Sequence, residues 1–145
     1  MNTEFRLFGS YSNGTLRRED LLPAFADAAE DLPKWLEKMD PERATDLRNA
    51  AADALAHLAA TDDVMADALA ELDDAINAHN PEGVYFGSHE GDGADFGFWV
   101  SSVFLDDIRE DDDIRERVEV SDHGNVTLFD RPVDDDNRRI VWAIV

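Results

Sequence analysis

The hydrophobic pattern changes at Pro81, and this change constrains the fold more than any other feature of the chain. Before Pro81 the apolar residues recur at helical spacing, and after it they alternate with polar residues, as in strands. Helices followed by strands are typical of an α+β domain. Because 145 residues suit one ordinary domain better than two, we expect a single domain, 1–145, with a mainly helical half at 1–80 and a mainly β half at 81–145.

Capping signals divide the helical half. Asp40 and Thr61 each stand directly before a stretch of helical periodicity, where a short polar side chain accepts a hydrogen bond from the first turn. The predicted helices cover 16–38, with a restart at Pro33, then 41 to about 60, and finally 62–78. The expected buried stripes are Leu47, Ala51, Ala54 and Leu58 on one helix and Met65, Leu69, Leu72 and Ile76 on the next.

Short apolar runs with a period of two predict about five strands in the second half. They are expected at 84–88, 95–102, 117–121, 125–129 and 139–145. The third and fourth runs predict a hairpin, because Gly124 between them is able to adopt the positive φ of a tight turn. The last strand is apolar on both faces, which indicates a central or covered position. We therefore expect the helices to pack on one face of an antiparallel β meander.

The charge balance is strongly acidic. The chain has 13 basic and 34 acidic residues, a formal net charge of −21, and no cysteine. Such a surface disfavours direct nucleic-acid binding, which needs clustered lysine and arginine, and points to a basic protein as partner. One alternative is a salt-adapted or GC-biased domain of unknown function whose acids only solvate it.

Two groups of acids are the candidate partner-binding residues. On the helix over 62–78, carboxylates spaced three or four residues apart fall opposite the apolar stripe and form a row at a pitch of about 6 Å. Such a row is able to imitate a phosphate backbone for a protein whose groove is built for DNA. The row comprises Asp63, Asp67, Glu71 and Asp74, and a second patch comprises Asp106, Asp107, Glu110, Asp111, Asp112 and Asp113.

Two histidine-containing loops raise the alternative of a metal-dependent site. His89 and Asp92 lie in one loop, and Asp122 and His123 in the other, with ligand types that suit a transition metal. Turn formation is the favoured interpretation of both loops, with Asp122 bonding the backbone of its own turn and His123 exposed at the tip. We therefore expect no metal and no cofactor.

No sequence pattern of a catalytic nucleophile or a phosphate-binding loop is found, so we expect a protein that is not an enzyme. Aromatic residues gather on the first two predicted strands, where core packing is favoured over a ligand-stacking face. These residues are Tyr85, Phe86, Phe96, Phe98 and Trp99, and Trp35 and Trp142 are expected in the core as well. With no signal peptide and no membrane-spanning run, a cytoplasmic protein is expected.

The stretches GSHEGDGADFGFW and VEVSDHGNVTLFD, with the closing IVWAIV, resemble small uncharacterised proteins carried by phages and other mobile elements. The resemblance covers roughly residues 83–145 and brings no established activity or catalytic residues. It implies a setting of host interaction, in which acidic proteins block nucleic-acid-binding enzymes. The function expected from the sequence is a strongly acidic inhibitor that binds a host nucleic-acid-binding protein by charge mimicry of DNA.

Overall fold

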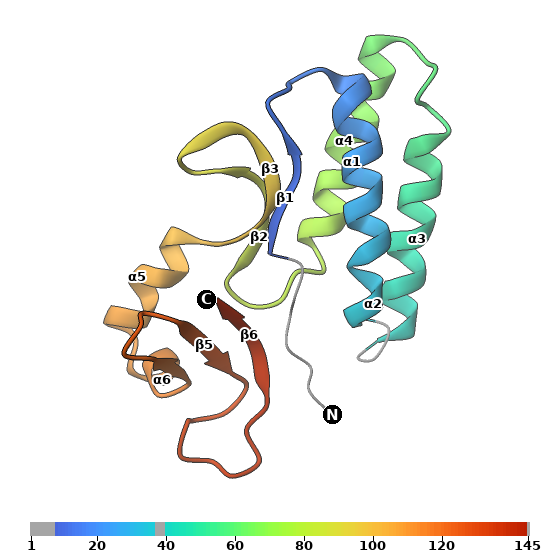
Figure 1. Cartoon of the computed structure of the whole chain (residues 1–145). Helices are drawn as coiled ribbons and strands as arrows, with labels where there is room; N and C mark the ends of the chain where they lie inside the picture. Colours follow the sequence, from blue (N-terminus) through green and yellow to red (C-terminus); the bar gives the residue numbers. More distant parts are fainter. Residues whose placement is uncertain (1–7, 37–39, 145) are drawn as a thin grey trace. The chain divides into compact units, whose positions relative to one another are not determined.

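The helical half folds largely as its apolar spacing predicts, but of the two predicted caps only Asp40 accepts side-chain hydrogen bonds, because the Thr61 side chain makes none. The structure, a computed structural model, describes residues 8–36 and 40–144, without the side chains of residues 35 and 36 (Figure 1). Its first helices are α1 (Arg18–Asp31), α2 (Pro33–Leu36), α3 (Pro41–Leu55) and α4 (Asp62–Asn77). The expected core position of Trp35 and the predicted segment ends at residues 38 and 145 lie outside the described residues.

The cap of α3 is confirmed, but the helix is shorter than predicted. Asp40 Oδ1 accepts hydrogen bonds from the backbone nitrogens of Glu42 and Arg43 at 3.1 and 3.5 Å. After Leu55 the chain continues in tight turns, in which a backbone nitrogen donates to the carbonyl three residues earlier instead of four. The turns are tighter than those of an α-helix, so the following side chains rotate away from the buried helix face. Leu58 is therefore 40% exposed instead of lying on the buried stripe.

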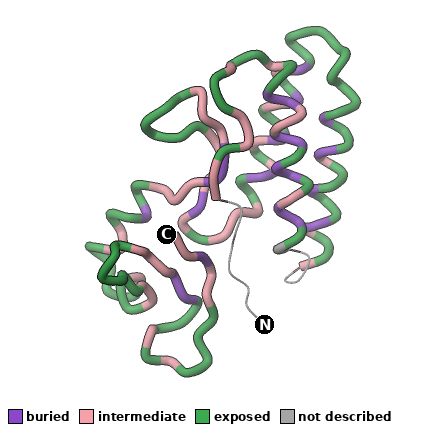
Figure 2. The backbone as a smooth tube through the Cα atoms, viewed as in Figure 1, coloured by how far each residue is buried: buried purple, intermediate pink, exposed green. Residues whose placement is uncertain are grey.

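The helices α1, α3 and α4 pack side by side around a core rich in alanine and leucine (Figure 2). On α4 the predicted stripe is confirmed in large part, because Met65, Leu72 and Ile76 are buried, whereas Leu69 is half-buried. Ala68 completes this buried face. The small side chains of the core allow the helix backbones to approach closely.

The strands form two three-stranded antiparallel sheets, so the expectation of a single five-strand meander is wrong. One sheet has the order β1 (Gly9–Asn13), β3 (Asp92–Val100), β2 (Val84–His89). The other has the order β4 (Val118–Val120), β5 (Val126–Phe129), β6 (Ile140–Ile144). All five predicted strands exist with shifted ends, and β1 is an additional one. The meander is interrupted because β3 leads into a helix rather than into a turn.

Two short helices that the sequence analysis did not predict follow β3 in the chain and precede β4. They are α5 (Ser102–Glu110) and α6 (Asp112–Arg115). Only Phe104 of this segment is buried, while Val103 is 67% exposed. Phe104 and Ile108 do lie four residues apart, as on one helix face, but the sequence analysis considered this stretch only as an acid run. The strand predicted to reach residue 102 ends at Val100, where this helical segment follows.

The packing divides the chain into two units, and each is discontinuous in sequence. The described part of the helical unit comprises residues 8–36 and 40–80 and Tyr85–Trp99, and that of the C-terminal unit comprises Pro81–Val84 and the chain from Val100. In the helical unit, the Phe25 ring of α1 packs against Phe86 and Phe96 at centroid distances of 4.9 and 5.5 Å. Helix α1 thus covers one face of the β1–β3–β2 sheet.

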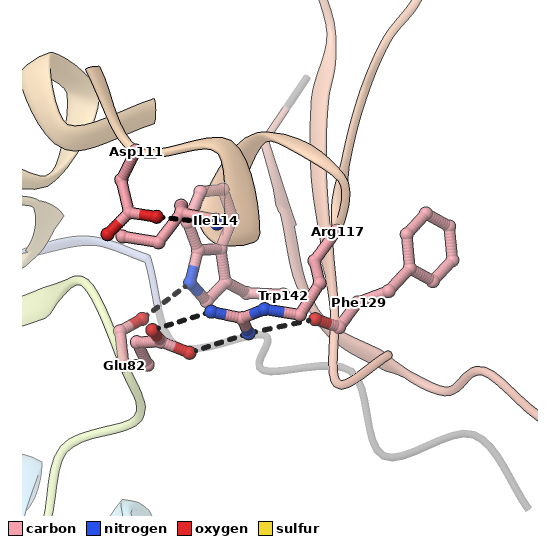
Figure 3. A network of polar contacts seen from close by, with 6 residues as sticks. All are labelled: Glu82, Asp111, Ile114, Arg117, Phe129 and Trp142. Atoms are coloured by element: carbon pink, nitrogen blue, oxygen red, sulfur yellow. Dashed lines mark hydrogen bonds and ion pairs between the residues drawn. The ribbon is translucent and has the colours of Figure 1, made fainter. Parts of the chain in front are cut away.

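In the C-terminal unit, polar bonds hold the Pro81–Val84 segment to the second sheet (Figure 3). Both Glu82 carboxylate oxygens accept from the Arg117 guanidinium at 2.8 and 2.9 Å, and Trp142 Nε1 donates to the Glu82 carbonyl at 2.8 Å. Trp142 is completely buried, as predicted, although β6 is an edge strand and not a central one. Arg117 also donates to the Phe129 carbonyl at 3.3 Å.

Candidate binding surface on the acidic helices

The predicted row of carboxylates lies on the outer face of α4. All four of its residues are exposed and stand opposite the buried stripe of the same helix. At 1.5 Å of rise per residue, successive carboxylates are about 4.5 to 6 Å apart along the axis. The row consists of Asp63, Asp67, Glu71 and Asp74.

None of the four carboxylates of the row takes part in an ion pair with another described residue. The neighbouring Asp62, in contrast, binds the Arg18 guanidinium of α1. Burial and the charge of Asp74 raise the pKa of the half-buried Asp73 above its usual value of 3.8, and a hydrogen bond from Asn77 opposes this shift. The outer side of α4 therefore presents a line of negative charge without an intramolecular counter-charge among the described residues.

Two acids of the second predicted patch stabilise the local structure of the C-terminal unit. Asp111 is the N-cap of α6, because its Oδ1 accepts from the backbone nitrogens of Asp113 and Ile114 at 2.9 and 3.4 Å. Asp112 forms an ion pair with Arg115 one turn later. Asp107 is half-buried, and the remaining acids of the patch, Asp106, Glu110 and Asp113, are exposed. Capping and ion pairing explain part of this patch without any partner.

A cleft between α3 and α4 adds a feature that the sequence analysis missed. Its volume is about 150 Å³, and it lies within the helical unit. The apolar part of its lining is Ala50, Ala54, Ala68 and Leu72, and the polar part is Asp53, His57 and Glu71. Glu71 belongs to the α4 row, while Asp53 comes from α3. Carboxylates therefore stand on both helices that border the cleft.

The loop that contains His89 is a turn whose polar groups bond to its own backbone. The strands extend further than predicted, to His89 and from Asp92, so only two residues connect them. His89 Nδ1 accepts from the Gly91 backbone nitrogen at 2.9 Å, and its ring packs edge-on against Trp99 at 4.7 Å. Asp92 Oδ1 accepts from the Ala94 nitrogen at 3.0 Å. These hydrogen bonds give His89 and Asp92 a structural role in forming the turn.

The second histidine loop is also a turn, but Ser121 rather than Asp122 makes its side-chain bond. Ser121 Oγ accepts from the Asn125 nitrogen at 3.1 Å, and Gly124 has a φ of 83°, as the predicted hairpin requires. His123 is exposed at the tip. Across the described residues there is no group of three or more histidine, aspartate or glutamate side chains placed to hold a metal ion.

The aromatic residues of β2 and β3 divide between the two faces of their sheet. Phe86 and Phe98 are buried and pack at 5.0 Å, which places them in the core as favoured. Their neighbours Tyr85 and Trp99 are half-buried and, by strand alternation, lie on the opposite face. Trp99 Nε1 donates to the Gly87 carbonyl at 3.0 Å, and the Tyr85 hydroxyl donates to the Ser88 carbonyl at 3.0 Å.

Asn77 has a structural role that the sequence analysis missed. At the end of α4, its side-chain oxygen accepts from the Phe86 nitrogen at 2.8 Å, and its Nδ2 donates to the Phe86 carbonyl at 3.0 Å. An amide pairs in this way because it carries a donor and an acceptor side by side. The only signal in the sequence is an asparagine near a helix end, which more often indicates a helix stop.

Comparisons with protein families, with curated proteins and with solved structures find no match to this chain. Among the described residues, no helix combines the length and the apolar character needed to cross a bilayer.

Proposed function

We propose that the chain is an acidic binding protein that occupies the basic groove of a nucleic-acid-binding protein by imitating the charge of DNA. The observation that carries this proposal is the exposed row on α4, whose carboxylates have no ion-pair partner among the described residues. A helix face needs polarity to be solvated, but it does not need a single sign of charge. Repulsion between like charges four residues apart costs a few tenths of a kcal/mol per pair, so the row is unfavourable for an isolated helix.

The cleft beside the row supports the same proposal. Duplex DNA presents two lines of phosphates that border a groove. In this chain, Glu71 of α4 and Asp53 of α3 place a negative charge on each side of the cleft, as the two phosphate lines do on each side of a DNA groove. The partner inferred from this chemistry is a protein whose DNA-binding surface is rich in lysine and arginine. No catalytic role enters the proposal.

A displacement assay tests this function. A dimer of core histones serves as the probe, since histones bind duplex DNA through its backbone without base readout. We expect the chain to release a fluorescent duplex of about 20 base pairs from the dimer, and the release to weaken steeply between about 50 and 200 mM salt as charges are screened. Failure of the wild-type chain to release the duplex in large excess would contradict the proposal.

Charge reversal separates a shaped surface from bulk charge. Changing Asp63, Asp67, Glu71 and Asp74 to lysine takes the net charge from −21 to −13 and leaves the buried stripe intact. The matched control reverses four exposed acids of the C-terminal unit: Glu119, Asp122, Asp134 and Asp136. We expect the first variant to lose displacement, because attractive pairings become repulsive, and the control to retain most of it. Equal losses would show that net charge alone drives the association.

A further inference from the structure

The cleft between α3 and α4 has a composition that a solvated helix surface does not require. Its alanines leave a hollow where larger apolar side chains would close the helix pair. Ala54, Ala68 and Leu72 are buried, Ala50 is half-buried, and Asp53, His57 and Glu71 at the mouth are exposed. An apolar floor below a carboxylate on each bordering helix is complementary to a side chain that is aliphatic along its stem and cationic at its tip.

The volume agrees with this chemistry. A cavity of roughly 150 Å³ holds a molecule the size of benzene, which is comparable to the outer part of a lysine or arginine side chain. Neither Asp53 nor Glu71 has an ion-pair partner among the described residues, so the positive tip would meet carboxylates that no described arginine or lysine neutralises. The flat imidazole of His57 at the same mouth offers a surface on which a planar guanidinium stacks.

We propose that this cleft is an anchoring pocket for one arginine or lysine side chain of a basic protein partner. The inference rests on the proposed function and makes it more specific, because it distinguishes one seated cation from the diffuse attraction of the row. Interface energy concentrates in a few side chains held in well-packed pockets, with arginine prominent among them. The pocket would then determine the position at which the partner binds along the acidic helices.

The direct test uses a blocked pentapeptide with one central arginine as the probe. Its citrulline analogue keeps nearly the same size but carries no charge. We expect the arginine peptide to shift the methyl NMR signals of Ala54 and Ala68 in a saturable manner, and the citrulline peptide to leave them unchanged. Shifts of similar size along the exposed faces of the helices, with none concentrated at these two methyls, would overturn the proposal.

Filling the cleft without changing any charge gives the sharpest variant. Ala50→Leu places three additional carbons in the hollow, whereas Ala52→Leu, its control, adds them at an exposed position of the same helix that does not line the cleft. We expect Ala50→Leu to weaken binding of the arginine peptide about tenfold to thirtyfold, the range of a lost interface anchor. Ala52→Leu should bind as the wild type does. Equal affinities in both variants would contradict the proposal.

A second pair of variants keeps the test decisive if Ala50→Leu fails to fold. Asp53→Asn with Glu71→Gln removes the two carboxylates at the cleft, and Glu42→Gln with Asp46→Asn removes two exposed acids of α3 that do not line it. We expect only the first pair to abolish the saturable shifts. Equal weakening by both pairs would mean that bulk attraction, and not a pocket, holds the arginine.

The two proposals fail in different ways. If reversal of Asp63, Asp67 and Asp74 abolishes release of DNA from the histone dimer, and Ala50→Leu leaves both this release and peptide binding unchanged, the pocket is wrong and the proposed function stands. If the triple reversal leaves release intact while the arginine peptide still saturates the cleft, the pocket stands and charge mimicry by the row is wrong.

Discussion

At the scale of single residues, the close approach of two strand backbones depends on a glycine. A side-chain carbon built on Gly97 would lie 1.9 Å from the Gly9 carbonyl oxygen of β1, far inside van der Waals contact. The glycine allows β1 to join the edge of β3. The sequence shows Gly97 only as a glycine between aromatic residues, and its neighbour in space is 88 positions away in the chain. Such a constraint is a property of strand pairing, so no local pattern reveals it.

Gly97→Ala should therefore destabilise the helical unit severely. We expect a loss of about 1–3 kcal/mol or more in the free energy of unfolding, because backbone rather than a flexible side chain must move. Chemical denaturation measures this loss. Gly93→Ala on the same strand is the control, since nothing lies within 4 Å of its added carbon. A Gly97→Ala variant as stable as the control would show that β1 does not approach β3 in this way.

At the scale of elements, the sequence predicts those parts that a local pattern determines. Asp40 marks the start of α3, because a cap acts within one turn of its own residue. Helix α5 is not predicted, although Phe104 and Ile108 lie four residues apart at helical spacing, because the run of acids that follows is interpreted only as a charged surface. The division of strands between two sheets also escapes prediction. It depends on which strands pair at a distance, and alternation along each strand contains no information on its neighbours.

The contact between the Pro81–Val84 segment and the second sheet depends on Arg117. Its side chain is 20% exposed and binds Glu82 with two nitrogens, whereas Arg115, with 56% exposure, forms a pair with Asp112 on the surface of α6. Arg117→Met should lower the free energy of unfolding by about 1–3 kcal/mol, since it also leaves the Phe129 carbonyl without its guanidinium donor. Arg115→Met should cost less than about 1 kcal/mol. Thermal unfolding of both variants checks this order, and equal losses would contradict it.

Helix α3 is joined to the end of α4 by a bond that responds to pH. Arg43 Nε donates to His79 Nδ1 at 2.9 Å, and burial together with the Arg43 charge lowers the pKa of His79 below 6.5, against smaller opposing effects of Asp46 and Asp40. The unfolded chain therefore takes up a proton at this histidine at a higher pH than the folded chain does. Stability from this group is present above pH 6.5 and is lost as the pH falls towards the lower value of the folded state.

Denaturation curves between about pH 7.5 and 5.5 measure this contribution. We expect the wild-type chain to lose stability over this interval and His79→Gln to lose less. His123→Gln, which changes an exposed histidine at a hairpin tip, should behave as the wild type does. If His79→Gln keeps the full slope, the Arg43 bond is not its source.

At the scale of the whole molecule, the net charge of −21 opposes folding through self-repulsion. The row on α4 could be predicted from helical spacing, because helix periodicity alone decides which residues share a face. The cleft beside it could not be predicted, since it results from the depth at which two helices with small side chains pack. Sequence therefore locates the acids, and only the fold shows which of them border a hollow.

Rising salt should stabilise the chain, because screening weakens repulsion among the acids. Urea denaturation at low and at high sodium chloride measures this effect. Reversal of the four α4 acids to lysine should hold or raise stability at low salt and reduce the dependence on salt. A stability that stays flat from low to high salt would remove the alternative in which the acids serve only to adapt the chain to a saline interior.

The interleaving of the two units along the chain has a consequence for synthesis. The helical unit takes Tyr85–Trp99 from beyond the Pro81–Val84 segment, and the C-terminal unit takes that earlier segment for its own contacts. When Asn80 leaves the ribosome, the three long helices are available, but β1 still has no strand beside it. Neither unit can be completed until later residues emerge, so during synthesis both sheets can form only after all three long helices have left the ribosome.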